Sequence, residues 1–152
     1  MSETAKLVCL TCGQSNRVPA TRLDQAPKCG VCGDPLVSGK VAEIDAGTHD
    51  KASRGDGLPL IVDYWAPWCG PCRMMAPEFA KAAGRLTPQV RFAKINTDEH
   101  PAVSQRLGIR GITLLILWAN GREVARLPGA RPAAEIEAFV RTNARTNAGS
   151  PH

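Results

Sequence analysis

Six cysteines constrain the folding of this 152-residue chain more than any other feature of its sequence. They occur as three Cys-x-x-Cys pairs, which are Cys9–Cys12, Cys29–Cys32 and Cys69–Cys72. The chain does not open with a basic segment followed by an apolar one, so a cytoplasmic location is the default expectation. Because structural disulfides are rare in a reducing compartment, metal binding or redox chemistry is the expected use of each pair.

The first forty residues are too poor in large apolar side chains to build a core of their own. They contain no Phe, Tyr or Trp, yet they hold four of the six cysteines. A segment this small needs a cross-link in order to fold. We therefore predict a separate module over residues 1–40, a larger domain over residues 41–145 and a tail over residues 146–152.

The spacing of the four N-terminal cysteines is typical of a zinc site. Sixteen residues separate the two Cys-x-x-Cys pairs, and such spacing is usual for four-cysteine zinc proteins. Four thiolates complete a tetrahedron and leave no open position, so we expect one structural Zn²⁺ per chain. Gly13 and Gly33, which follow the second cysteine of each pair, suit a backbone with positive φ. Two disulfides, free thiols or an iron–sulfur cluster are the alternatives that spacing leaves open.

The third pair lies between a predicted strand and a predicted helix. Residues 60–65 (LIVDYW) are apolar and rich in β-formers, and a helix is expected to begin near Pro71. Gly70 and Pro71 fill the turn between the cysteines. The free N–H groups and dipole of the helix N-terminus favour the thiolate of Cys69. We expect Cys69 to attack a substrate disulfide and Cys72 to resolve the mixed disulfide.

The rest of the chain alternates predicted strands and helices. Strands are expected at 41–45, 60–65, 90–95, 114–118 and 122–127, and helices within 46–57 and at 71–86, 101–108 and 131–143. The early crossovers predict parallel strands, and a late hairpin through residues 119–121 adds an antiparallel edge. This order indicates an α/β domain with a mixed sheet.

The segment LIVDYWAPWCGPCRMMAPEF resembles the active-site segment of thioredoxins, and FAKINTDEHPAVSQRLGIRGITLLILWANGREVARLPGARP continues the resemblance. It extends from about Val41 to Ala144. With the four-cysteine segment added, the chain is similar to the zinc-containing thioredoxins of bacteria. The resemblance implies the thioredoxin fold, a central mixed sheet flanked by helices, with a small N-terminal zinc-ribbon module. It also implies reduction of disulfide-containing proteins, with no bound organic cofactor and with electrons from an NADPH-dependent thioredoxin reductase.

The same resemblance implies roles for individual residues. Cys69 matches the nucleophile, Cys72 the resolving cysteine, and Asp63 the buried aspartate that takes a proton from the resolving cysteine. Burial of an acid within LIVDYW should also raise its pKa, unless Asp63 lies at a wet strand end. The matching supporting residues are Trp68, Gly70, Pro71, Lys94 and Gly129. The alternative interpretations are core packing for Trp68, a strand-edge position for Lys94 and a simple turn for Gly129.

The chain departs from the family at Thr113. Thioredoxins carry a cis-proline after the isoleucine of GIRGI, facing the Cys-x-x-Cys turn, and this chain has Thr113 at that position. A cis bond before a residue other than proline costs roughly 3–4 kcal/mol. We therefore expect a trans Ile112–Thr113 bond and a rearranged loop before LLIL. Thr113 should also alter the edge at which a substrate backbone pairs.

Charge and histidine content bear on the remaining functions. The net charge of +5 is spread along the chain without a basic run of five residues, so no nucleic-acid partner is expected. No apolar stretch is long enough for a membrane span. His49, His100 and His152 are scattered, and lone histidines are expected at the surface or in caps. A zinc-linked redox sensor, or a zinc ribbon that recruits a partner on a thioredoxin scaffold, is the alternative to a disulfide reductase.

Overall fold

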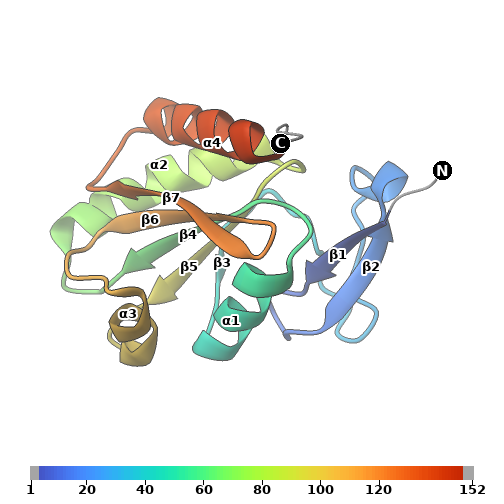
Figure 1. Ribbon diagram of the computed structural model, residues 1–152, viewed down its shortest axis with the longest axis horizontal. Coiled ribbons are helices and arrows are strands. Elements are labelled where there is room, and N and C mark those ends of the chain that lie inside the picture. The colour runs from blue at the N-terminus through green and yellow to red at the C-terminus, as the bar shows by residue number, and fades with distance from the viewer. Residues whose placement is uncertain (1–3, 149–152) are drawn as a thin grey trace.

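The computed structural model describes residues 4–148, with side-chain surroundings through Ala144. The N-terminal part contains a two-stranded antiparallel sheet of β1 (Thr4–Val8) and β2 (Ser15–Pro19), followed by the short 3-10 helix η1 (Ala20–Arg22). The remainder forms a five-stranded sheet with helices on both faces (Figure 1). The two parts lie side by side, with β1 next to α1 in the view of Figure 1.

The five strands form a mixed sheet in the order β3-β5-β4-β6-β7. Their bounds are β3 Ala42–Glu43, β4 Leu60–Trp65, β5 Arg91–Asn96, β6 Leu114–Ala119 and β7 Arg122–Pro128. Strands β3 and β4 both pair with β5 in parallel, whereas β6 pairs antiparallel with β4 and β7 antiparallel with β6. The predicted parallel strands with an antiparallel edge are therefore confirmed.

Four helices cover the sheet: α1 (Ala46–Gly55), α2 (Gly70–Leu86), α3 (Pro101–Leu107) and α4 (Ala133–Ala148). Helices α2 and α4 lie on one face, and α1 and α3 on the other (Figure 1). Gly108 is the C-cap of α3, and its φ of 68° is a left-handed conformation that suits glycine at a helix end. Helix α4 continues five residues beyond the expected end at residue 143. The last four residues of the predicted tail, 149–152, lie outside the described residues.

Alternate residues of β4 supply the cores on the two faces of the sheet. Ile61 packs under α2 and α4 with Phe79 and Leu115, whereas Val62 and Tyr64 belong to the apolar cluster on the α1 and α3 face. This period of two is the reason that neighbouring residues of one strand reach different sites. No helix between residues 4 and 148 combines the length and the hydropathy that crossing a bilayer requires.

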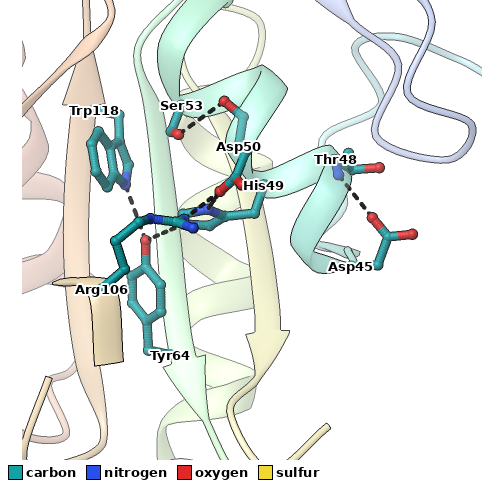
Figure 2. A network of polar contacts seen from close by, with 8 residues as sticks. All are labelled: Asp45, Thr48, His49, Asp50, Ser53, Tyr64, Arg106 and Trp118. Carbon is teal, nitrogen blue, oxygen red and sulfur yellow. Dashed lines mark hydrogen bonds and ion pairs between the residues drawn. The ribbon is translucent and has the colours of Figure 1, made fainter. Parts of the chain in front are cut away.

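A buried polar network holds α1 against the sheet, as Figure 2 shows. His49 Nε2 lies 2.6 Å from the hydroxyl of Tyr64, which also accepts a hydrogen bond of 3.1 Å from Trp118 Nε1. On its other side, His49 Nδ1 lies 3.3 Å from Asp50, whose carboxylate pairs with Arg106 of α3. The expectation that His49 lies at the surface or in a cap was wrong, because Tyr64 supplies a hydrogen-bond partner inside the core.

The N-terminal part packs against the five-stranded domain and shares its core. Val8 and Leu10 join the apolar cluster on the α1 face, and Leu58 of the larger domain packs on the small cluster around Leu7 and Leu36. Metal binding is therefore not the only interaction available to fold residues 1–40.

Arg91 of β5 joins the two parts through a set of buried hydrogen bonds. Its guanidinium donates to the carbonyl oxygens of Val8 at 2.8 Å and Leu36 at 2.9 Å. It also pairs with Asp56 at 2.7 Å, and the Asp56 carboxylate accepts a hydrogen bond from Val8 N. Only 2% of each charged side chain is exposed. Nothing in the sequence pattern around Arg91 indicates this contact.

Candidate active site and metal centre

The third cysteine pair lies where β4 leads into α2. Cys69 is the N-cap of α2, and its sulfur accepts a hydrogen bond of 3.2 Å from the backbone N–H of Cys72. Gly70 and Pro71 form the first turn between them. The two cysteines form a disulfide with their Cα atoms 5.3 Å apart. In the reduced form, the same N–H group and the helix dipole would stabilise negative charge on Cys69 Sγ.

Cys72 faces the sheet from α2. Cys72, Met75 and Phe79 are buried and follow one another at helical spacing, so they share one face of the helix. Phe79 and Met75 belong to the same core cluster as Ile61 of β4. Asp63 lies two residues after Ile61 in that strand and points to the same face. Cys72 and Asp63 therefore share the layer between α2 and the sheet.

Asp63 lies in the centre of the sheet, where water is excluded. It pairs with Lys94 of β5 and with Leu115 of β6, and only 2% of it is exposed. Burial raises the pKa of Asp63 to about 6, while the Thr113 hydroxyl and the Lys94 charge act in the opposite direction. The Lys94 ammonium lies 5.1 Å from the ring centroid of Trp65. Asp63 therefore does not lie at a solvent-exposed end of its strand.

The prediction of a trans bond before Thr113 was wrong, because the Ile112–Thr113 bond is cis. Two hydrogen bonds hold Thr113 in this arrangement. Its hydroxyl donates to Asp63 Oδ1 at 2.8 Å, and its carbonyl oxygen accepts from Gly129 N at 3.0 Å. Gly129 has a φ of 87°, which suits glycine. Thr113 is buried, and its hydroxyl contacts Asp63. Its side chain therefore points into the protein and not only toward the edge at which a substrate backbone would pair.

The surface around the disulfide is partly apolar. Trp68, with 68% of its area exposed, donates from Nε1 to Asp98 at 3.2 Å, and Met74 is also exposed. Trp68, Arg110 and Ile112 line a shallow hollow beside the disulfide loop. Core packing is therefore excluded as the role of Trp68, and this surface is accessible to another chain.

The four N-terminal cysteines form a compact cluster and are not joined by disulfides. Their sulfur atoms all lie within 4.8 Å of one another, with separations of 3.6 Å for Cys9 and Cys32 and 3.7 Å for Cys12 and Cys29. Tetrahedral zinc with Zn–S bonds of about 2.3 Å places its sulfur ligands about 3.8 Å apart. The cluster therefore fits zinc, and both of these separations join one Cys-x-x-Cys pair to the other.

Backbone N–H groups around the cluster favour the thiolate of Cys29, whereas at Cys12 and Cys32 the backbone hydrogen bonds are outweighed by burial and the neighbouring cysteines, which raise the pKa. Val31 N donates to Cys29 Sγ at 3.4 Å. The backbone N–H groups of Cys32 and Val31 lower the pKa of Cys29 to about 6. Gly13 and Gly33 have φ values of 83° and 81°, so the predicted glycine turns are confirmed.

Comparisons with known proteins agree with this geometry. The family profile described as "Thioredoxin" matches residues 40–142. The chain belongs to the thioredoxin family. A zinc-ribbon profile described as "Thioredoxin 2, N-terminal" matches residues 8–34, which include all four clustered cysteines. The chain is therefore a thioredoxin-type disulfide oxidoreductase with an N-terminal zinc ribbon.

Relatives of this thioredoxin cover most of its length. Thioredoxin C-3 of Corynebacterium nephridii is 39% identical over 134 residues, which are 88% of this chain and 92% of the relative. Thioredoxin 1 of Synechococcus elongatus is 47% identical over 95 residues, 62% of this chain and 89% of the relative. Among solved structures, chloroplastic thioredoxin z superposes with a TM-score of 0.64 at 31% identity, over 69% of this chain and 95% of that one.

The contact between Thr113 and Asp63 was not expected from the sequence. The available signal was strand register. Thr113 lies two residues before Leu115, and Leu115 is the β6 partner of Asp63. Residues two apart in a strand share a face, so a correct pairing of the two strands would have placed the hydroxyl beside the carboxylate.

Proposed function

We propose that this chain reduces disulfides of other proteins through the dithiol of Cys69 and Cys72, while a structural zinc ion organises its N-terminal part. The observation that carries the proposal is the position of Cys69 at the N-terminus of α2, with its sulfur accepting the N–H of Cys72. A thiolate at that position is stabilised by the helix N-terminus, and Cys69, although only 3% exposed, lies directly beside the exposed Trp68.

The reaction begins with attack of the Cys69 thiolate on one sulfur of a substrate disulfide. The substrate S–S bond breaks, its other sulfur leaves as a thiolate and takes a proton from water, and Cys69 is left in a mixed disulfide. Cys72 then loses its proton to the Asp63 carboxylate and attacks Cys69 Sγ. The second substrate sulfur leaves, and two electrons have passed from the dithiol to the substrate.

The oxidised pair needs two electrons before another cycle. An NADPH-dependent thioredoxin reductase is the proposed donor, and disulfide-containing proteins of the cytoplasm are the proposed acceptors. Trp68 is proposed to contact them, because it is the exposed aromatic side chain next to Cys69. Gly70 and Pro71 keep the turn tight, and Gly129 supports the loop of Thr113 through its N–H. Lys94 supplies positive charge near Asp63.

The zinc ion is proposed to be structural, with one ion per chain. Cys9, Cys12, Cys29 and Cys32 would supply all four ligands and leave no open position, so no substrate could reach the metal. Bound zinc would hold two loops whose own apolar cluster is small.

An insulin reduction assay with NADPH and thioredoxin reductase tests the proposal, with zinc analysis of the same sample. We expect NADPH oxidation that requires the chain, and one zinc per chain. A double variant, Cys9→Ser with Cys12→Ser, should lose zinc. A double variant, Cys69→Ser with Cys72→Ser, should keep zinc but lose reduction. Full activity of the second variant would exclude this dithiol as the redox centre.

Redox sensing at the zinc site is a second candidate, favoured by the exposure of Cys12 and Cys32. Oxidants in solution reach these two sulfur atoms more easily than the buried pair of Cys9 and Cys29. Zinc release by hydrogen peroxide, followed with a chromogenic chelator, tests this function. Release at a rate no faster than the oxidation of free cysteine would argue against a sensor.

A further inference from the structure

We propose that Thr113 is a positioning residue for the resolving step, in which its hydroxyl orients Asp63 and keeps the carboxylate ionised as a proton acceptor. The inference rests on the proposed function, since it concerns how Asp63 takes the proton of Cys72. It assigns Thr113 a contribution to the reaction at the position where thioredoxins carry proline.

The hydrogen bond between these two residues has one possible direction when Asp63 is charged. An ionised carboxylate only accepts, so the Thr113 hydroxyl donates to Oδ1 across the observed 2.8 Å. Both side chains are buried, at 2% exposure for Asp63 and 3% for Thr113. A hydrogen bond donated to the charged form favours that form, and it does so more strongly where water is absent.

The surrounding strands fix the direction of the hydroxyl. Thr113 precedes β6 directly, and its carbonyl oxygen accepts from Gly129 N at the end of the β6–β7 hairpin. Asp63 is held on its two sides by β5 and β6. The branched side chain of threonine also restricts rotation about its first torsion angle. Both partners are therefore positioned before Cys72 gives up its proton.

The other groups that face Asp63 do not replace this hydrogen bond. From β6, its neighbour Leu115 is apolar, and the buried residues in the first two turns of α2, which packs on this face, are Cys72 and Met75. From β5, Lys94 acts on Asp63 through its charge, and its ammonium lies over the ring of Trp65. Among the described residues, Thr113 is the hydrogen-bond donor to this carboxyl group.

Loss of the hydroxyl should therefore shift Asp63 toward its neutral form. A neutral carboxylic acid cannot take the proton of Cys72, so the fraction of molecules competent for the resolving step would fall near neutral pH. The effect should vanish at alkaline pH, where Asp63 is ionised with or without Thr113. A residue with only a packing role would not produce this dependence on pH.

The test compares Thr113→Val, which keeps the shape and removes the hydroxyl, with Thr113→Ser, which keeps the hydroxyl. Carboxyl ¹³C NMR of the oxidised protein follows the ionisation of Asp63 without any catalytic assay. We expect the Asp63 midpoint to rise by about one pH unit in Thr113→Val, and by much less in Thr113→Ser. Insulin reduction by Thr113→Val should be about fivefold slower than wild type at pH 6, about twofold slower at pH 7, and nearly equal at pH 8.5.

An unchanged Asp63 midpoint in Thr113→Val would overturn the proposal, as would a rate lowered by the same factor at every pH. If Thr113→Val does not fold, Thr113→Ala removes the hydroxyl with a smaller side chain and must show the same midpoint shift. If the wild-type chain itself fails to reduce insulin, the proposed function fails. The NMR titration alone then decides whether Thr113 controls the ionisation of Asp63.

Discussion

Asp63 is an ionisable side chain in the middle of an apolar strand, between Val62 and Tyr64. Burial raises its pKa to about 6, whereas aspartate in an unfolded chain has a pKa of about 3.9. The folded state therefore binds the proton more tightly than the unfolded state. Between these two values the unfolded state carries fewer protons, so the free energy of unfolding falls as the pH rises.

Replacement Asp63→Asn should make the chain more stable and less active. The gain in unfolding free energy should be about 3 kcal/mol at pH 8, from a shift of about two pKa units. It should be small near pH 3.5, where Asp63 is neutral in the folded state and mostly neutral in the unfolded state. Urea unfolding of the oxidised protein at the two pH values measures it. A similar gain at both would mean that packing, and not charge, accounts for the change.

Variants of the two active-site cysteines should accumulate different amounts of mixed disulfide with a substrate. Cys69→Ser removes the attacking sulfur, so no mixed disulfide forms, whereas Cys72→Ser removes only the resolving sulfur and leaves substrates bound to Cys69. Non-reducing electrophoresis after incubation with insulin distinguishes them. Equal accumulation of mixed disulfides in both variants would contradict the order of attack.

At the scale of elements, apolar periodicity was sufficient to locate the five strands of the larger sheet. Strand β4 reads as LIVDYW and β6 as LLILWA, and both are fully or almost fully buried. Strands β1 (TAKLV) and β2 (SNRVP) carry too few apolar residues for such a pattern, so they were not predicted. Their pairing depends on the cysteine loops and on contacts with the larger domain, which no local pattern reports.

The packing of α1 on the sheet could not be predicted from the sequence either, because it depends on a hydrogen bond between residues of two different elements, His49 of α1 and Tyr64 of β4. Tyr64→Phe removes the hydroxyl that contacts both His49 Nε2 and Trp118 Nε1. Two buried polar groups would each lose a partner, so we expect a loss of about 1–3 kcal/mol in unfolding free energy. Insulin reduction at 25 °C should stay unchanged, because Tyr64 faces α1 and Asp63 faces α2.

Thermal and urea unfolding measure the effect of Tyr64→Phe. Ser53→Ala is the matched control on α1, because Ser53 donates only to the Asp50 carbonyl oxygen of its own helix (Figure 2). Its effect on stability should be smaller. If both variants unfold at the same denaturant concentration as wild type, the network does not hold α1 on the sheet.

At the scale of the whole molecule, the zinc ribbon and the thioredoxin domain are joined by close backbone contact as well as by side chains. Gly57 N donates to the carbonyl oxygen of Lys6 at 2.6 Å. A Cβ atom at Gly57 would lie only 2.9 Å from Lys6 N, so glycine is required at this approach. The difference in composition predicts two modules, but the residues that join them are far apart in the chain and follow no motif.

Arg91→Met tests whether this junction stabilises both parts. The substitution keeps an unbranched apolar stem but leaves the Asp56 carboxylate and the carbonyl oxygens of Val8 and Leu36 without the guanidinium. Removing one partner of a buried ion pair costs about 3–5 kcal/mol, so the unfolding free energy should fall by that order. Arg85→Met is the control, because Arg85 is 58% exposed in its pair with Glu137 and exposed pairs contribute about 0–1 kcal/mol.

The same variant should also hold its zinc less well. Val8 precedes Cys9, a proposed zinc ligand, and the backbone N–H and carbonyl oxygen of Val8 are both bonded to the Asp56–Arg91 pair. Loss of the guanidinium frees the end of β1 that leads into the first Cys-x-x-Cys loop, so the loop should open more often and expose the metal. Zinc transfer to a chromogenic chelator should therefore be faster for Arg91→Met than for wild type or Arg85→Met. If all three proteins lose zinc at one rate while Arg91→Met is less stable, the zinc ribbon holds its metal independently of the thioredoxin domain.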